Sequence, residues 1–107
     1  MFNSHDEIKL IDFGFAVFMK KKKELLYVSG TPYYFAPEAL IYDKKDNEKS
    51  LQGYKCDIWS LGVLLYFMLT GEMPFEGEDT DELFENVKKG KFTIPPKVSE
   101  SAANLIK

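Results

Sequence analysis

The sequence predicts a mainly α-helical fold, and three observations on its 107 residues point to that class. The stretch from Asp57 to Leu69 is apolar on nearly every side, which predicts a helix buried inside a domain. Asp79 and Ser99 each precede a further helical pattern, where their side-chain oxygens can cap the first turn. The clearest strand pattern is the short run Ile8–Ile11, so we expect only a short β-hairpin, at the N-terminus.

Composition excludes several classes of protein. A net charge of −3 argues against a nucleic-acid-binding surface over the whole chain. Cys56 is the only cysteine, so no internal disulfide can form. The first residues lack the basic and apolar regions of a secretory signal. We therefore expect one small intracellular domain, in the cytoplasm, with no nucleic-acid partner and no membrane span.

The predicted strand Ile8–Ile11 is followed at once by Asp12-Phe13-Gly14. An acid, an aromatic residue and a glycine at the end of a strand make a sharp exit, and they leave one carboxylate at its tip. Taken alone, Asp12 is equally well explained as a turn or capping residue.

Two charged runs predict exposed loops. Lys20–Lys23 is a run of four lysines, which favours a solvated loop over a localisation signal or a docking patch for acidic groups. Asp43–Ser50 contains no apolar residue and predicts a surface insertion.

A turn and a short helix lie between these loops. Ser29-Gly30-Thr31-Pro32 is a turn cluster, and an aromatic triplet follows it. Ala36-Pro37-Glu38 then opens a short helix, with its proline in the first turn, which we expect to run to about Tyr42.

The apolar helix is the predicted centre of the domain. Thirteen residues span ~20 Å, which is too short for a bilayer core of ~30 Å. Asp57 can cap its start and Gly71 can close its end in a left-handed turn, after which Pro74 prevents the helix from resuming. Because the helix is apolar all round, we expect it to be buried on all sides.

Two more helices are predicted after this one. Asp79-x-x-Glu82 resembles a capping box, and Gly90 ends the helix that it opens. Ser99 looks like the cap of a last helix. The apolar positions expected to pack are Leu83, Phe84 and Val87 in the first of these helices, and Ala102, Ala103, Leu105 and Ile106 in the second.

These motifs, in this order, resemble the C-terminal lobe of a eukaryotic Ser/Thr protein kinase. Asp12-Phe13-Gly14 resembles the motif that opens the activation segment of that family, and Ala36-Pro37-Glu38 resembles the motif that closes it. The sequence from Asp57 to Gly62 resembles the start of the central F helix. Within that family, the sequences of these motifs most resemble the calcium/calmodulin-dependent group, which includes the calcium-dependent kinases of plants and protozoa. The stretches Gly71–Phe75 and Val98–Lys107 resemble the same group.

The resemblance implies a phosphate-transferring role. Asp12 would hold the Mg²⁺ that bridges the phosphates of ATP, with Phe13 and Gly14 beside the cofactor. Phe13 would pack inward. Thr31 corresponds to a threonine near the catalytic aspartate, which favours Ser or Thr over Tyr as the phosphate acceptor.

Other positions carry implied roles in substrate binding, structure and regulation. The floor of the substrate site would consist of Gly30, Thr31, Pro32, Tyr34 and Phe35. Structural roles fall on Glu38, which in the family pairs with an arginine that this chain lacks, on Asp57, which would brace the catalytic loop, and on Trp59. The candidate phosphorylation sites are Tyr27, Ser29 and Thr31.

The same resemblance implies that the chain is an incomplete kinase domain. We expect residues 1–107 to form a partial kinase domain, with the activation segment, helices EF, F and G and the start of H, but without the N-lobe and the catalytic loop. ATP, Mg²⁺ and protein substrates would then belong to a parent enzyme, with a calcium-sensor domain or calmodulin outside this chain. The isolated chain is expected to be inactive, and to self-associate through exposed apolar surface.

Two alternatives remain at this point. The chain could instead belong to a non-catalytic, pseudokinase-like scaffold that binds protein partners. It could also be a generic helical interaction domain in which the motifs occur by chance.

Overall fold

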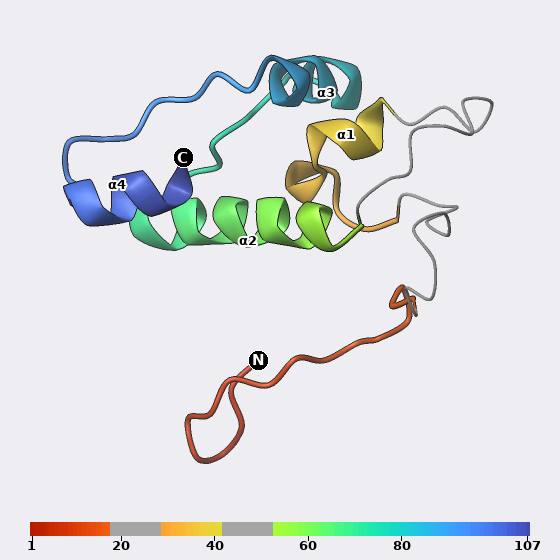
Figure 1. Cartoon of the computed structure of the whole chain (residues 1–107), viewed down its shortest axis with the longest axis vertical. Helices are drawn as coiled ribbons and strands as arrows, with labels where there is room; N and C mark the ends of the chain where they lie inside the picture. Colours follow the sequence, from red (N-terminus) through yellow and green to blue (C-terminus); the bar gives the residue numbers. More distant parts are fainter. Residues whose placement is uncertain (18–28, 42–52) are drawn as a thin grey trace.

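The computed structural model describes residues 1–17, 29–41 and 53–107, and it is mainly helical, as predicted. Figure 1 shows the elements, which are the 3-10 helix η1 (Pro32–Tyr34) and the α-helices α1 (Pro37–Leu40), α2 (Gly53–Thr70), α3 (Thr80–Lys89) and α4 (Glu100–Ile106). Three features named above lie outside the described residues: the run Lys20–Lys23, Tyr27 and the loop Asp43–Ser50.

Helix α2 is the longest element and begins earlier than predicted. It starts at Gly53, so Asp57 lies inside the helix and does not cap it. The residues before Asp57 contain no proline that would stop the helix from extending backwards. Its end is as predicted, because Gly71 adopts a left-handed φ of 80° and donates its N–H to the Phe67 carbonyl at 2.7 Å.

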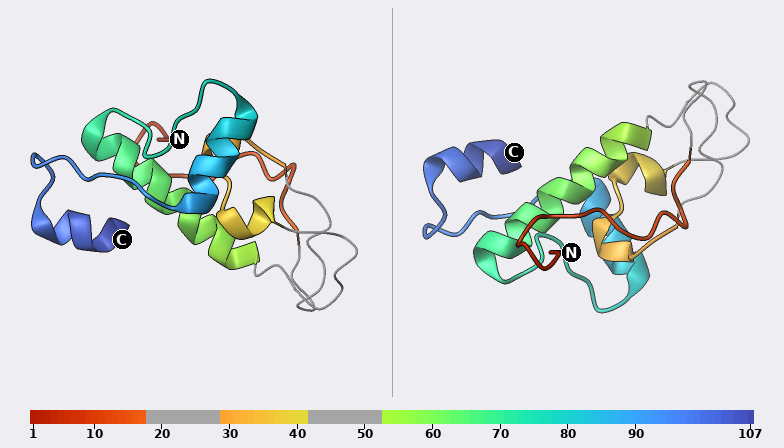
Figure 2. Two further views of the ribbon diagram at one scale, coloured as in Figure 1. Left: turned by 90° about the horizontal axis from the view of Figure 1, so that it is seen from above. Right: turned by 90° about the horizontal axis from the view of Figure 1, so that it is seen from below.

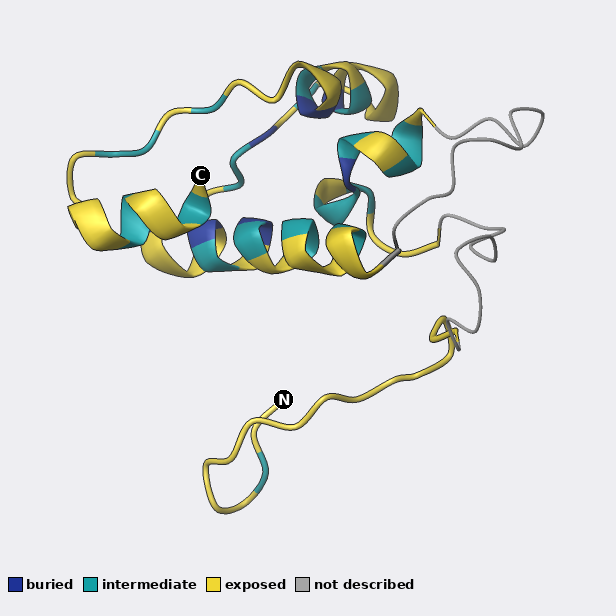
Figure 3. Ribbon diagram, viewed as in Figure 1, coloured by how far each residue is buried: buried dark blue, intermediate teal, exposed yellow. Residues whose placement is uncertain are grey.

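The prediction that α2 is buried on all sides is wrong. Val63, Tyr66 and Thr70 are buried on one side of the helix, whereas Ile58 and Met68 are 67% and 70% exposed. The cause is the arrangement of the neighbouring elements. Figure 3 shows the exposed side of α2 turned away from the other helices, and α2 packs mainly against η1 and α4.

A small aromatic and aliphatic core joins the helices. Phe75, Leu83 and Val87 are buried at its centre. The partly buried side chains packed around them are Leu40, Trp59, Phe84 and Phe92. Because these residues come from five different segments, the core fixes the position of α3 against α1 and the middle of α2.

Helix α3 has the boundaries that its local sequence predicts. The Asp79 carboxylate accepts the Glu82 backbone N–H at 2.9 Å, and Gly90 ends the helix with a left-handed φ of 63°. The Glu82 side chain accepts the Glu78 N–H at 2.7 Å, one residue earlier than a standard capping box would have it.

Helix α4 follows an extended segment and packs on α2 (Figure 2). Ser99 caps it as predicted, by accepting the Ala102 N–H at 3.3 Å. Two hydrogen bonds hold the extended segment to α2: the Tyr66 hydroxyl donates to the Thr93 carbonyl at 2.9 Å, and the Lys97 ammonium donates to the Thr70 carbonyl at 2.9 Å.

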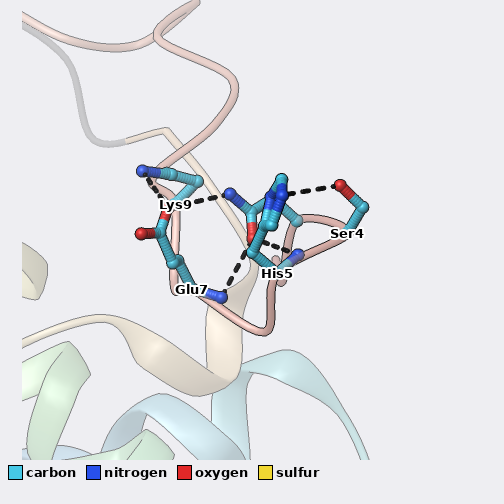
Figure 4. Close-up of polar contacts among 5 residues, drawn as sticks. Ser4, His5, Glu7 and Lys9 are labelled. Atoms are coloured by element: carbon cyan, nitrogen blue, oxygen red, sulfur yellow. Dashed lines mark hydrogen bonds and ion pairs between the residues drawn. The ribbon is translucent and has the colours of Figure 1, made fainter.

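The N-terminal hairpin is reduced to one antiparallel bridge between Phe2 and Ile8. Its turn is held by polar side chains, shown in Figure 4. The side-chain oxygen Oδ1 of Asn3 accepts the backbone N–H groups of His5 and Glu7, and Lys9 forms a 2.9 Å ion pair with Glu7. Among the described residues, the hydrogen bonds of residues 1–17 stay within that segment.

Within residues 1–17, 29–41 and 53–107, no helix combines the length and the apolar character that a membrane crossing requires.

Candidate functional site

The first motif, Asp12-Phe13-Gly14, forms a tight turn after the hairpin. Asp12 has a left-handed φ of 59°, which aspartate tolerates better than most residues. Its Oδ1 atom accepts the Gly14 N–H at 3.2 Å, and the Phe13 carbonyl accepts the Ala16 N–H at 3.0 Å. The turn therefore leaves the Asp12 carboxylate exposed to solvent.

Phe13 differs from the expected inward packing, because its side chain is 68% exposed. None of the hydrogen bonds of the described segment 1–17 reaches the helices, and the apolar side chains around the motif are exposed as well. The motif therefore forms its local turn, but its side chains are not packed against the helices.

The second candidate group, around η1, is anchored to the helices at two points. The Ser60 hydroxyl of α2 donates to the Tyr34 carbonyl at 2.8 Å. The ring of Phe35 lies 6.0 Å from that of Phe84 in α3. Pro32 fixes the backbone at the start of η1, so the sequence itself favours this turn.

Gly30 and Thr31 directly precede η1. The backbone of Thr31 is extended, whereas that of Gly30 has a positive φ. Gly30 has a φ of 136°, which other residues adopt with strain. Thr31 stands at the N-cap of η1, but its hydroxyl makes no capping hydrogen bond, and the residue is exposed. The hydroxyl of Thr31 is therefore accessible for contact with another molecule.

Glu38 lies in the first turn of α1 and is exposed, so its carboxylate is not buried without a partner. Its Oε1 atom accepts a long 3.8 Å hydrogen bond from the Cys56 thiol. Burial of Cys56, together with the smaller effects of the Glu38 and Asp57 charges, raises the pKa of that thiol to about 11. Cys56 is therefore protonated at neutral pH and a poor nucleophile.

Trp59 is part of the core, as predicted. Its ring stacks on Phe75 with centroids 5.7 Å apart and an angle of 11° between planes. The indole Nε1–H is buried and finds no acceptor among the described residues, which costs roughly 1–3 kcal/mol.

Beside Trp59 lies an open groove of about 710 Å³ between α2, α4 and the turn after α3. Its lining is mostly apolar and includes Tyr66, Phe75, Phe92 and Ile106, together with the charged Glu38. Neither Asp12 nor Thr31 is among the residues that line it. The groove is therefore separate from the motif residues.

The structure brings together η1, α1 and α2, with Tyr34, Phe35, Glu38 and Trp59, but not Asp12. In the described part of the chain, no three His, Cys, Asp or Glu side chains gather as a metal site would require. Asp12 contributes one carboxylate. The described residues alone therefore do not form a Mg²⁺ or ATP site.

Sequence reasoning missed Ser60, which holds the aromatic turn on α2. A serine within an otherwise apolar helical stretch was the signal that could have identified it, since a polar side chain in a packed helix needs a partner.

Comparison with known proteins gives consistent matches along the chain. The family described as the protein kinase domain matches residues 1–107. Calcium-dependent protein kinase 25 of Arabidopsis thaliana is 40% identical over the whole chain, which covers 20% of that protein. Calcium-dependent protein kinase 3 of Plasmodium berghei (strain Anka) is 44% identical over 94% of the chain and 18% of its own length. Calcium-dependent protein kinase 5 of Plasmodium falciparum (isolate 3D7) is 41% identical over 97% of the chain and 18% of its own length. The chain thus spans about a fifth of the length of the curated relatives it matches.

Proposed function

The chain belongs to the protein kinase family, in its calcium-dependent serine/threonine group, and we propose that it forms part of the C-terminal lobe of an active kinase. The complete enzyme would transfer the γ-phosphate of ATP to serine or threonine in protein substrates. The observation that carries this proposal is the family match over residues 1–107, in which the motifs occur in family order. This order over the whole chain disfavours a helical domain with chance motifs.

In the proposed enzyme Asp12 is a ligand of the Mg²⁺ that neutralises the phosphates of ATP, beside Phe13 and Gly14. Two features support this role. The Asp12 carboxylate is exposed, and the Gly14 N–H fixes one of its oxygens at 3.2 Å. A positioned, solvent-facing carboxylate is the kind of ligand that a hard cation takes. The remaining ligands and the nucleotide pocket belong to other parts of the kinase fold.

Residues Gly30, Thr31, Pro32, Tyr34 and Phe35 are proposed as the floor of the protein-substrate site. Support comes from their attachment to rigid elements, since Ser60 holds the Tyr34 carbonyl and Phe84 packs against Phe35. A substrate-binding segment needs this kind of support, because small displacements of a bound substrate strongly reduce the reaction rate. The exposed Thr31 hydroxyl would contact the catalytic machinery.

Glu38, Asp57 and Trp59 are proposed as structural residues of the lobe. Glu38 and Asp57 are exposed, which leaves both carboxylates available for pairing with segments of a complete kinase. Ser29 and Thr31 are exposed hydroxyls and candidate phosphorylation sites. Tyr27 remains a candidate that lies outside the described residues.

By itself the chain is proposed to be inactive, because phosphoryl transfer needs a nucleotide cradle and a catalytic base that the described residues do not assemble. A calcium-sensing region or calmodulin, and the protein substrates, would engage the complete enzyme inside the cell, in the cytoplasm. The exposed apolar side chains support self-association of the isolated chain.

A chimeric enzyme tests the kinase proposal. Residues 1–107 replace the matching stretch of calcium-dependent protein kinase 3 of Plasmodium berghei, and transfer of phosphate from ATP to a protein that this relative phosphorylates is measured. We expect transfer on serine or threonine by the chimera and none by the 107-residue chain. A folded, calcium-responsive chimera without transfer would support the pseudokinase-like scaffold instead.

A further inference from the structure

The side chain of Phe35 contacts two neighbours from different parts of the chain. One is Gly30, where an added Cβ atom would lie 3.4 Å from the Cε1 atom of Phe35, so the ring lies close to the bare backbone of this glycine. The other is Phe84 of α3, whose ring centroid is 6.0 Å from that of Phe35, within the range of an aromatic pair. Phe35 and Phe84 are both half-buried, so neither side chain is free to turn as an exposed one is.

Helix α3 holds Phe84 in a fixed position. Leu83 and Val87, on the same helix, are 3% and 0% exposed and belong to the core. The Asn86 side-chain amide donates to the Glu76 carbonyl at 2.9 Å and ties the helix to the preceding loop. Helix α3 also packs against both η1 and α1 (Figure 1). The Phe84 ring is therefore a rigid support for Phe35.

The two supports of the proposed substrate floor act on different atoms. Ser60 binds the backbone carbonyl of Tyr34 and so fixes the path of the chain. Phe84 contacts the ring of Phe35 and so fixes the direction of a side chain. The floor itself contains no charged residue, so a substrate side chain that lies on it gains from apolar contact and finds no ionic partner.

We propose that Phe84 is a positioning residue for substrate selection and acts through Phe35. It holds the Phe35 ring as an apolar surface for the substrate side chain that follows the acceptor serine or threonine. The enzyme thereby prefers protein substrates with a bulky apolar residue at that position. This inference rests on the proposed function, to which it adds a residue outside the floor and a class of substrate.

Steady-state kinetics of the chimeric kinase described above test the proposal. Two peptides are compared that differ only in the residue after the acceptor serine, which is leucine in one and alanine in the other. The wild-type chimera is expected to favour the leucine peptide ~10-fold or more in kcat/KM. Phe84→Leu should reduce this preference ~5-fold or more, chiefly by raising KM for the leucine peptide. Phe84→Tyr keeps the ring and should retain the preference.

The matched control is Phe92→Leu. Phe92 is a half-buried ring packed on the same core, but its ring contacts are with Tyr66 and Phe75 and not with the floor. This variant loses a similar amount of core packing and should keep the leucine preference. Equal preferences in Phe84→Leu and the wild-type chimera, or equal losses in Phe84→Leu and Phe92→Leu, would overturn the proposal.

A second variant keeps the test decisive if Phe84→Leu does not fold. Phe35→Leu replaces the supported ring itself and should cause the same loss of preference. Where both single variants fold, the double variant should lose no more than either one, because both substitutions act on one surface. Additive losses in the double variant, or an unchanged preference in Phe35→Leu, would contradict the proposed path through Phe35.

Peptide binding without ATP separates failure of this inference from failure of the proposed function. Fluorescence anisotropy of the labelled peptides should show tighter binding of the leucine peptide to the chimera, and a smaller difference for Phe84→Leu. This result in a chimera that transfers no phosphate would support the inference and contradict the catalytic proposal. A folded, active chimera that binds both peptides equally would overturn the inference and leave the kinase assignment in place.

Discussion

The Ser60 hydroxyl donates a 2.8 Å hydrogen bond to the Tyr34 backbone carbonyl, and the same hydroxyl lies 3.0 Å from the Cys56 carbonyl of its own helix. Twenty-six residues separate Ser60 from Tyr34 in the sequence. This contact joins the central helix to the turn that is proposed to receive the protein substrate. Helix α2 thus positions the proposed substrate-binding turn through a polar contact as well as through apolar packing.

Replacing Ser60 by alanine should lower the free energy of unfolding by about 1 kcal/mol. The variant leaves the partly buried Tyr34 carbonyl without its donor, and an unpaired buried group is costly. The midpoint of urea unfolding, followed by Trp59 fluorescence, measures the change. Ser101→Ala, at an exposed serine of α4, is the control and should change the midpoint little. Equal midpoints for the two variants would contradict a stabilising role for the Ser60 contact.

Replacing Asp79 by alanine should destabilise the chain by roughly 0.5–2 kcal/mol, because the Glu82 N–H loses its capping acceptor. Asp81→Ala is the matched control, since it removes the same charge from the first turn of α3 without removing the cap. Helix content by circular dichroism and the unfolding midpoint should fall more for Asp79→Ala than for Asp81→Ala. The cap would have no special role if the two variants behaved alike.

Thiol labelling should report the raised pKa of Cys56. Burial first, then the carboxylates of Glu38 and Asp57, raise the pKa of this thiol from 9.0 to about 11. At pH 8 the folded chain should therefore react with a thiol reagent at least about tenfold more slowly than the urea-unfolded chain. The labelling rate of the folded chain should rise as the pH approaches 11. Equal rates for folded and unfolded chains would rule out the shift.

The raised pKa of Cys56 also makes the folded state less stable at alkaline pH. Because the folded pKa lies above the unfolded one, the thiol's contribution to stability is fully present below pH 9 and is lost as the pH rises to about 11. The urea midpoint should fall over this interval more for the wild-type chain than for Cys56→Ser. A parallel decline in both proteins would assign the effect to other groups.

The helix boundaries could be predicted where the signal is local. Asp79, Gly90 and Ser99 act on backbone groups within four residues, and the structure has all three in the predicted roles. The start of α2 at Gly53 could not be predicted in the same way. No strong cap precedes Asp57 in the apolar pattern, and helix propagation through the preceding residues is favourable.

Burial and non-local contacts were harder to predict. The apolar character of α2 was correctly identified, but which side is covered depends on where η1, α3 and α4 pack. The exposure of Phe13 and Glu38 has the same origin, since the order of motifs in a sequence does not specify which surfaces meet. The serine at position 60 indicates locally that a hydrogen-bond partner is needed, but the sequence does not specify that this partner is the distant Tyr34 carbonyl.

The most direct test of the central claim is phosphate transfer by the chimera described above, compared with its Asp12→Asn and Glu7→Gln variants. If Asp12 holds the cation of a working kinase, Asp12→Asn should lower kcat by ~100-fold or more. Glu7→Gln, an exposed hairpin carboxylate in the same segment, should leave kcat within twofold. Retention of full activity by Asp12→Asn, or equal losses in both variants, would contradict the account.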